Sequence, residues 1–175
     1  SQMVRKANAP GDASMPVATG EPADFASISP TGKWMSWVDP AGHLVIMKVA
    51  TGETHKVPEP GEVLSAASWS PDDTHVVVEA FDWGAPGVYM ADVTSGRALR
   101  LTAADGGEGM PAWSPDGARV VTVSEREGKP ALWVHTHVED YVTLLATRDE
   151  PGAFARPARL KMPAPPGARR FRNAK

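Results

Sequence analysis

Ala112–Gly117 reads Ala-Trp-Ser-Pro-Asp-Gly, and this stretch decides the fold because weaker copies of it occur twice more in the 175 residues. Ser68–Asp73 reads Ser-Trp-Ser-Pro-Asp-Asp, and Ser27–Gly32 reads Ser-Ile-Ser-Pro-Thr-Gly. In such a stretch the proline fixes φ at the first turn position, and the Asp or Thr side chain bonds back to the backbone. The glycine accepts the positive φ that ends the turn. Each copy therefore predicts a sharp corner in a chain built of repeats.

These corners assign structural roles to a small set of residues. The proline, aspartate and glycine shape the turn. The tryptophan two residues before the proline is expected to project between neighbouring repeats, and Ile28 takes its place in the first copy. The corner residues are Pro30, Gly32, Trp69, Pro71, Asp72, Trp113, Pro115, Asp116 and Gly117.

The spacing of the corners and the residues between them predict strands. The corner prolines Pro30, Pro71 and Pro115 lie 41 and 44 residues apart, which is the period of four-stranded propeller blades. Runs such as Val76–Val78 are rich in β-branched residues and alternate poorly, which indicates a sheet covered on both faces, as in stacked blades. Expected strands, besides the segment leading into each corner, are 33–38, 43–49 and 54–57, then 75–81, 88–93 and 98–102, then 119–123, 131–137 and 141–146.

The predicted fold class is all-β, a partial β-propeller arc of about three four-stranded antiparallel blades with extended N- and C-terminal arms. Proline and glycine without sustained periodicity mark both arms. The expected domains are an arm over 1–23, an arc over 24–147 with blades at about 24–58, 65–102 and 110–146, and a basic proline-rich tail over 148–175.

The repeats resemble the β-propeller repeat of TolB-type proteins, which also occurs in prolyl-oligopeptidase-like enzymes. The resemblance rests on Trp-Ser-Pro-Asp-Gly, a Val-rich strand, an aromatic-containing strand, then Asp92–Gly96 (Asp-Val-Thr-Ser-Gly) and Arg100–Thr102 (Arg-Leu-Thr). It covers roughly residues 24–146 and implies an extracytoplasmic bacterial setting. The chain departs from the pattern at Thr31, at Asp73, and at 138–140, where Val-Glu-Asp replaces a Thr-Gly turn.

Three blades are too few for a closed ring, since propellers close with about four to eight. An open arc leaves two blade faces with apolar side chains to be covered. A homodimer forming a six-bladed ring, docking against a different protein, further blades of a longer chain, or the two arms themselves would each cover them. The shortage of blades predicts that this chain works through contacts with other molecules.

Enzymatic function is not expected. A peptidase of the resembling kind needs a Gly-x-Ser-x-Gly elbow, and the chain has none. The chain also contains no cysteine, which excludes thiolate nucleophiles and thiolate metal sites. We therefore predict no catalytic residue and no cofactor.

The metal candidates are weak. His135, His137 and Glu139 alternate along one expected strand and so would point to one face. We favour a polar edge strand over a metal site, because no distant fourth ligand can be identified. Asp72 and Asp116 are explained by their turns, without calcium.

The C-terminal tail is the strongest candidate for partner binding. Residues 148–175 carry a net charge of +6 and residues 1–20 carry +1, which leaves −10 for the body of a chain whose net charge is −3. An extended basic tail seeks acidic protein or lipid surfaces, whereas the acidic body disfavours nucleic acid. The candidate partner-binding residues are Trp83, in a turn, and Arg156, Arg159, Lys161, Arg169, Arg170, Phe171 and Arg172 in the tail.

The sequence therefore predicts a non-catalytic scaffold, an accessory subunit that docks onto and stabilises a larger extracytoplasmic, membrane-associated complex, such as an envelope, respiratory or photosynthetic assembly. No apolar run reaches the roughly 18 residues of a membrane-spanning helix, which predicts a soluble or peripheral protein, and we expect a location peripheral to a membrane. One alternative is a homodimeric six-bladed propeller that binds a glycan or small ligand. Another is a propeller fragment of a prolyl-oligopeptidase-like enzyme.

Overall fold

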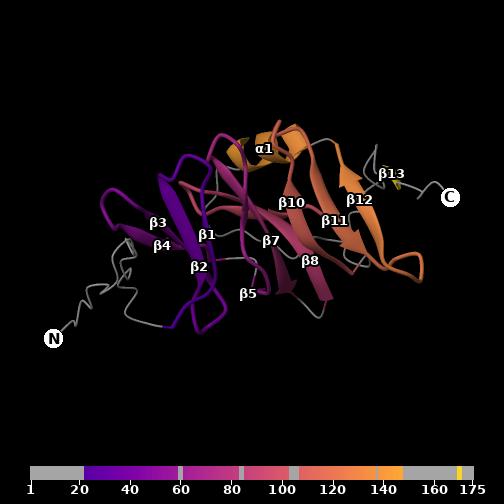
Figure 1. Ribbon diagram of the computed structural model, residues 1–175, viewed down its shortest axis with the longest axis horizontal. Helices are drawn as coiled ribbons and strands as arrows, with labels where there is room; N and C mark the ends of the chain where they lie inside the picture. Colours follow the sequence, from indigo (N-terminus) through magenta and orange to yellow (C-terminus); the bar gives the residue numbers. More distant parts are fainter. Residues whose placement is uncertain are drawn as a thin grey trace, which may run out of the picture.

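Three antiparallel sheets stand one after another along the long axis of the molecule, from the indigo end to the orange end of Figure 1. The computed structural model describes residues 22–58, 61–82, 85–102, 107–136 and 138–147 and the strand at 169–170. We call the sheets blades 1, 2 and 3 in chain order. The described chain is mostly β-structure, and it forms the predicted partial propeller.

The strands of each blade follow one another in chain order across the sheet. Blade 1 consists of β1 (Asp24–Ile28), β2 (Trp34–Val38), β3 (Leu44–Lys48) and β4 (Thr54–Lys56). Blade 2 consists of β5 (Glu62–Val63), β6 (Ser68–Trp69), β7 (His75–Asp82), β8 (Ala85–Asp92) and β9 (Ala98–Arg100), with β5 and β6 both paired to β7. Blade 3 consists of β10 (Glu108–Trp113), β11 (Val120–Ser124), β12 (Ala131–His135) and β13 (Arg169–Arg170).

The three corners have the predicted geometry. In each, the amide of the last corner residue donates to the carbonyl of the serine before the proline, at 2.9, 3.1 and 2.9 Å. That last residue is Gly32, Asp73 or Gly117, with φ of +73°, +61° and +73°. The Asp72 and Asp116 carboxylates accept the amides of the residue two positions on, both at 3.1 Å, so both carboxylates serve the turn.

The core lies between the blades, as the poor alternation of the strands predicts. Blade 2 uses alternate residues of β7 for its two sides: Val76 and Val78 pack toward blade 1, and Val77 packs toward blade 3. The buried Trp69 belongs to the first cluster, and the partly buried Trp113 packs against the second. Both corner tryptophans therefore lie between neighbouring blades, as expected.

The strand expected over 141–146 is wrong, because these residues belong to the helix α1 (Val138–Thr147). Val138, Tyr141, Val142 and Leu145 recur at the helical spacing and pack against the core between blades 2 and 3. No Thr-Gly turn precedes them to return the chain along β12, and acidic residues in the first turn suit a helix N-terminus. The place beside β12 is taken by β13, which pairs antiparallel with it.

The predicted shared strand face of His135, His137 and Glu139 is also wrong. The strand β12 ends at His135, Glu139 lies in α1, and His137 lies outside the described residues. The described residues contain no group of three or more potential ligands placed to hold a metal ion. Within the same residues no helix has the length and apolar character needed to cross a membrane.

Candidate protein-interaction site

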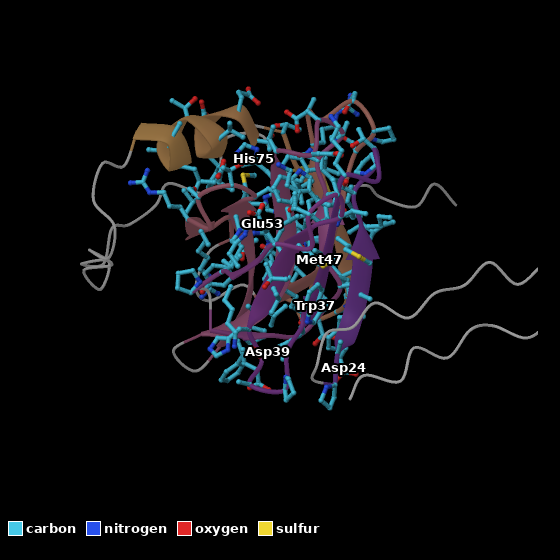
Figure 2. All side chains as sticks on the ribbon, turned by 90° about the vertical axis from the view of Figure 1, so that its left-hand side faces the viewer. Asp24, Trp37, Asp39, Met47, Glu53 and His75 are labelled. Atoms are coloured by element: carbon cyan, nitrogen blue, oxygen red, sulfur yellow. The ribbon has the colours of Figure 1, made fainter. Side chains whose placement is uncertain are left out.

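The outer face of blade 1 is one of two apolar end faces of the arc. Met35 lies opposite Met47, and Trp37 lies opposite Val45, so the four side chains share one face of the sheet. The alternate residues, such as Ile46, belong to the core shared with blade 2. Figure 2 looks onto this end of the molecule, with Trp37 and Met47 labelled. Trp37, Val45 and Met47 are 7%, 6% and 9% exposed and form a cluster of their own.

The outer face of blade 3 is the second end face. Val121 lies opposite Val134, and Val123 lies opposite Leu132, so these four side chains also share a face. The other face of the same strands carries Val120, which packs toward blade 2. Leu132 is 53% exposed, and Val121 and Val123 are half-buried. This end of the arc therefore presents accessible apolar surface.

Each end face occupies the position at which inner blades pack on each other. When the repeats are aligned on the corner proline, Trp37 corresponds to Val78, which faces blade 1 in the core. Val121 corresponds in the same way to Val77, which faces blade 3. Both end faces are therefore apolar for the same reason as the inter-blade core. Of the two, the outer face of blade 3 leaves its apolar side chains accessible, and exposed apolar surface of this kind marks interaction sites.

Side-chain hydrogen bonds hold neighbouring blades in register. The indole of Trp69 donates to the Ser27 hydroxyl at 3.1 Å, and the amide of Trp113 donates to the Ser68 hydroxyl at 2.9 Å. Ser27 and Ser68 both lie three residues before a corner proline, where blade 3 has the exposed Ala112. The outer side of blade 3 therefore lacks the hydroxyl that the inner junctions use.

The two departures at the first corners of the chain compensate each other. The Ser29 hydroxyl donates to the Asp73 carboxylate at 3.0 Å, and the Thr31 amide donates to it at 3.3 Å. The Thr31 hydroxyl donates to the same carboxylate. Asp73 stands where the third corner has glycine, and Thr31 where it has aspartate. Asp73 therefore takes the place of a turn glycine, and its bonds with Ser29 and Thr31 link blade 2 to blade 1.

Two large apolar side chains on the leading strands were missed by sequence reasoning. Phe25 and Met110 each lie five residues before a corner proline, at a register shift between the first and second strands of their blades. Both have positive φ, +53° and +50°, and Met110 is 73% exposed. The Glu79 carboxylate accepts the Met110 amide at 2.9 Å and helps to hold that bulge. A bulge changes the direction in which a side chain points. Phe25 and Met110 occupy the same position in their repeats, and this shared position is the sequence feature that could have identified them.

A buried polar cluster in blade 3 contains the metal candidate His135. The Glu108 carboxylate is 1% exposed, and it accepts from the Thr122 hydroxyl at 3.0 Å and lies 3.1 Å from His135 Nε2. Arg126 forms an ion pair with its other oxygen at 3.1 Å and stacks on Trp133. Burial would raise the pKa of Glu108, but His135, Thr122 and Arg126 together bring this pKa below its ordinary value. Such an enclosed cluster links three strands of blade 3 and offers no open site, although His135 Nδ1 has no hydrogen-bond partner.

The predicted partner-binding side chains cannot be placed. Trp83 and the tail residues Arg156, Arg159, Lys161, Phe171 and Arg172 lie outside the described residues. Arg169 and Arg170 are described only through the backbone pairing of β13 with Trp133 and Val134. Their role in binding stays a prediction.

Stacked antiparallel blades, a repeated Ser-Pro corner and an inter-blade core define a β-propeller repeat protein. The family described as the TolB beta propeller domain matches residues 18–157. The chain belongs to this family, as the sequence resemblance predicted.

The matches with known proteins cover part of this chain and a smaller part of each relative. The Tol-Pal system protein TolB of Alcanivorax borkumensis is 31% identical over 86 residues, which cover 47% of this chain and 20% of that protein. TolB from Acinetobacter baumannii superimposes with a TM-score of 0.59 at 20% identity, over 70% of this chain and 32% of that one. Dipeptidyl peptidase 4 of Porphyromonas gingivalis superimposes with a TM-score of 0.54 at 10% identity, over 67% and 24% of the two chains. These two structures show the shared fold alone.

Proposed function

We propose that this protein is a non-catalytic interaction scaffold, an accessory subunit that docks onto and stabilises a larger complex. The observation that carries the proposal is the apolar outer face of blade 3, where Leu132 lies opposite Val123 and is 53% exposed. The same face of an inner blade is buried against its neighbour, so this surface has the chemistry of an unfilled blade junction. A partner protein that presents an apolar face would fill it.

The setting proposed for this complex is extracytoplasmic and peripheral to a membrane. Curated relatives from Alcanivorax and Francisella carry the name Tol-Pal system protein TolB, which supports an assembly of proteins as the working context. The chain spans a fifth or less of the length of these relatives, so their partners are not transferred to it. Of the host complex, the proposal specifies only that it presents an apolar surface to the outer face of blade 3.

The basic tail supplies a second contact in this proposal. Residues 148–175 carry a net charge of +6 against the acidic body, and the arginines at 156, 159, 169, 170 and 172 provide most of it. An acidic protein or lipid surface beside the docked arc would attract them, and added salt would weaken this contact. The apolar face would hold the partner, and the tail would orient it.

Two leucines of nearly equal exposure test the proposal. The untagged protein is purified from its own host, and stoichiometric partners are identified by mass spectrometry. Leu132→Glu places a charge on the outer face of blade 3 and is expected to reduce partner recovery at least about tenfold, because an unpaired charge would be buried. Leu144→Glu, at a position 52% exposed on α1, should leave recovery unchanged. Equal recovery with both variants would contradict docking at this face.

The tail is tested by deleting residues 148–175 in the same experiment. We expect partial loss of the partner, and a smaller dependence of recovery on salt between 50 and 300 mM in the deletion variant than in the full chain. If the deletion changes neither the recovery of the partner nor its salt dependence, the tail does not contribute to binding. Docking would then rest on the outer face of blade 3 alone.

A further inference from the structure

Met110 lies beside the outer face of blade 3, the face proposed for docking. Ala112 of β10 lies opposite Val121, and Val121 lies opposite Val134, so these three side chains form one row across the outer face. Ala112 is exposed, and only the buried Pro111 separates it from Met110 on the same strand. The accessible apolar surface of the outer face therefore continues onto β10 as far as Met110.

The exposure of Met110 depends on a strained backbone. Among the large apolar side chains that the structure describes, Met110 has the largest exposed fraction, 73%. Its φ is +50°, in the left-handed region that a residue other than glycine rarely adopts. Such a conformation persists only where surrounding contacts hold it. The Glu79 carboxylate of blade 2 supplies this contact, because it accepts the Met110 amide at 2.9 Å.

The neighbouring residues are suited to this contact. A Cβ atom at Gly109 would collide with the Glu79 carboxylate, so a glycine is needed before Met110. The register shift between β10 and β11 falls between Gly109 and Ala112 and contains Met110. Residues of two blades thus hold one apolar side chain in water. Because water contact at Met110 gives the free chain no stability, this arrangement indicates a contact outside the chain.

We propose that Met110 is a second anchor of the docking face and inserts into an apolar pocket of the partner that covers Leu132. The inference rests on the proposed function, because it assigns Met110 to the same partner. A methionine side chain is unbranched and flexible, so it fits apolar pockets of irregular shape. Glu79 is a positioning residue that acts through Met110.

The edge of β10 is unsuited to pairing with a strand of the partner. Among the described strands β10 pairs only with β11, so it is an edge of its sheet, and edges of this kind can accept an added strand. In β10, however, the bulge interrupts the register, and Pro111 has no amide to donate. The partner therefore contacts β10 through side chains, with Met110 as the largest of them.

Substitutions at the same repeat position of blades 3 and 1 test the proposal. Met110→Lys should reduce recovery of the partner with the untagged native protein at least about tenfold, because the pocket would have to bury a charge. Phe25→Lys is the matched control, since Phe25 has a φ of +53° and is 49% exposed but belongs to blade 1. It should leave recovery unchanged. Unchanged recovery with Met110→Lys, or equal losses with the two variants, would overturn the proposal.

Methionine oxidation tests the same contact without a substitution. The native assembly and the chain expressed alone are treated briefly with hydrogen peroxide, and sulfoxide at each methionine is measured by peptide mass spectrometry. Met110 should react at least about tenfold more slowly in the assembly than in the chain alone. The fully buried Met90 should react slowly in both samples. Equal rates for Met110 in the two samples would overturn the proposal.

The positioning role of Glu79 is tested by coupling. Glu79→Ala removes the acceptor of the Met110 amide and should reduce partner recovery, whereas Glu79→Gln keeps an oxygen acceptor and should retain it. In the Met110→Lys background, Glu79→Ala should cause no further loss, because the anchor is already absent. Additive losses would overturn the positioning role.

The inference and the proposed function can fail separately. Loss of the partner with Leu132→Glu but not with Met110→Lys would overturn the second anchor and leave docking at blade 3 in place. A native protein that purifies without any partner would overturn both.

Discussion

At the scale of single residues, the linked corners of blades 1 and 2 show how two departures from a repeat, Thr31 and Asp73, act together. A non-glycine residue with φ of +61° is strained, and the bonds from Ser29 and Thr31 to the Asp73 carboxylate offset that strain. Replacing Thr31 by the aspartate of the third corner would bring two carboxylates together. The two positions should therefore be energetically coupled.

A double-mutant cycle measures this coupling. Asp73→Gly keeps the turn but removes the acceptor, and should lower the free energy of unfolding by about 1–3 kcal/mol. Thr31→Asp should destabilise the wild type through like-charge repulsion and cost less in the Asp73→Gly background, with a coupling of at least about 0.5 kcal/mol. Urea unfolding of the four proteins gives the values. Additivity within about 0.3 kcal/mol would contradict the link.

The buried Glu108 predicts how stability depends on pH. Its folded-state pKa lies below the ordinary value of 4.5, so its stabilising contribution is present above about pH 4.5 and is lost as pH falls through the folded-state pKa. Glu108→Gln should cost about 3–5 kcal/mol at pH 7, because it removes one partner of a buried ion pair. It should also flatten the fall in stability below pH 4.5. The control Glu53→Gln, at an exposed position, should change the free energy of unfolding at pH 7 by about 0.5 kcal/mol or less.

Sequence reasoning reached the corner itself but not its contacts. The positive φ of Gly32 and Gly117 follows from local turn chemistry, which the residues specify on their own. The contact of Thr31 with Asp73, and the burial of His135 against Glu108, depend on which residues of distant segments meet. Spacing along one strand does not reveal such partners. The sequence therefore predicts a polar edge strand for His135, whereas the structure buries this residue against Glu108.

At the scale of elements, α1 replaces a strand because its apolar residues follow the wrong period for a sheet. Val138, Tyr141, Val142 and Leu145 are separated by three, one and three residues, which places them on one side of a helix. Analogy with blades 1 and 2 predicts a strand over 141–146, after the segment 138–140 that replaces the turn. The periodicity of the four residues predicts the helix, and here the local pattern decides the structure over the repeat.

Neighbouring leucines of α1 test this account of the helix. Leu145 is buried in the core between blades 2 and 3, and Leu144 is largely exposed. Leu145→Ala should lower the free energy of unfolding by about 2–5 kcal/mol, whereas Leu144→Ala should change it by about 0.5 kcal/mol or less. Chemical denaturation of both variants checks the difference. Equal losses would mean that α1 does not pack on the core through the Leu145 face.

At the scale of the whole molecule, the repeats predict the blades, their number and their apolar faces. Each of the three corners marks one blade, and the Val-rich strand after it supplies residues that fill the spaces between sheets. The two end faces differ in a way that no repeat shows, because Trp37 is buried and Leu132 is exposed. Of the two end faces, the blade 3 face is therefore the more accessible to a partner.

The mass of the native protein, purified untagged from its own host, tests the central claim most directly. The account predicts an assembly well above the 18.6 kDa of the chain, which contains at least one other polypeptide in fixed stoichiometry. It also predicts that Leu132→Glu releases the chain from this assembly while Leu144→Glu does not. A cooperative monomer of 18.6 kDa with nothing bound, or an assembly made of this chain alone, would contradict the account.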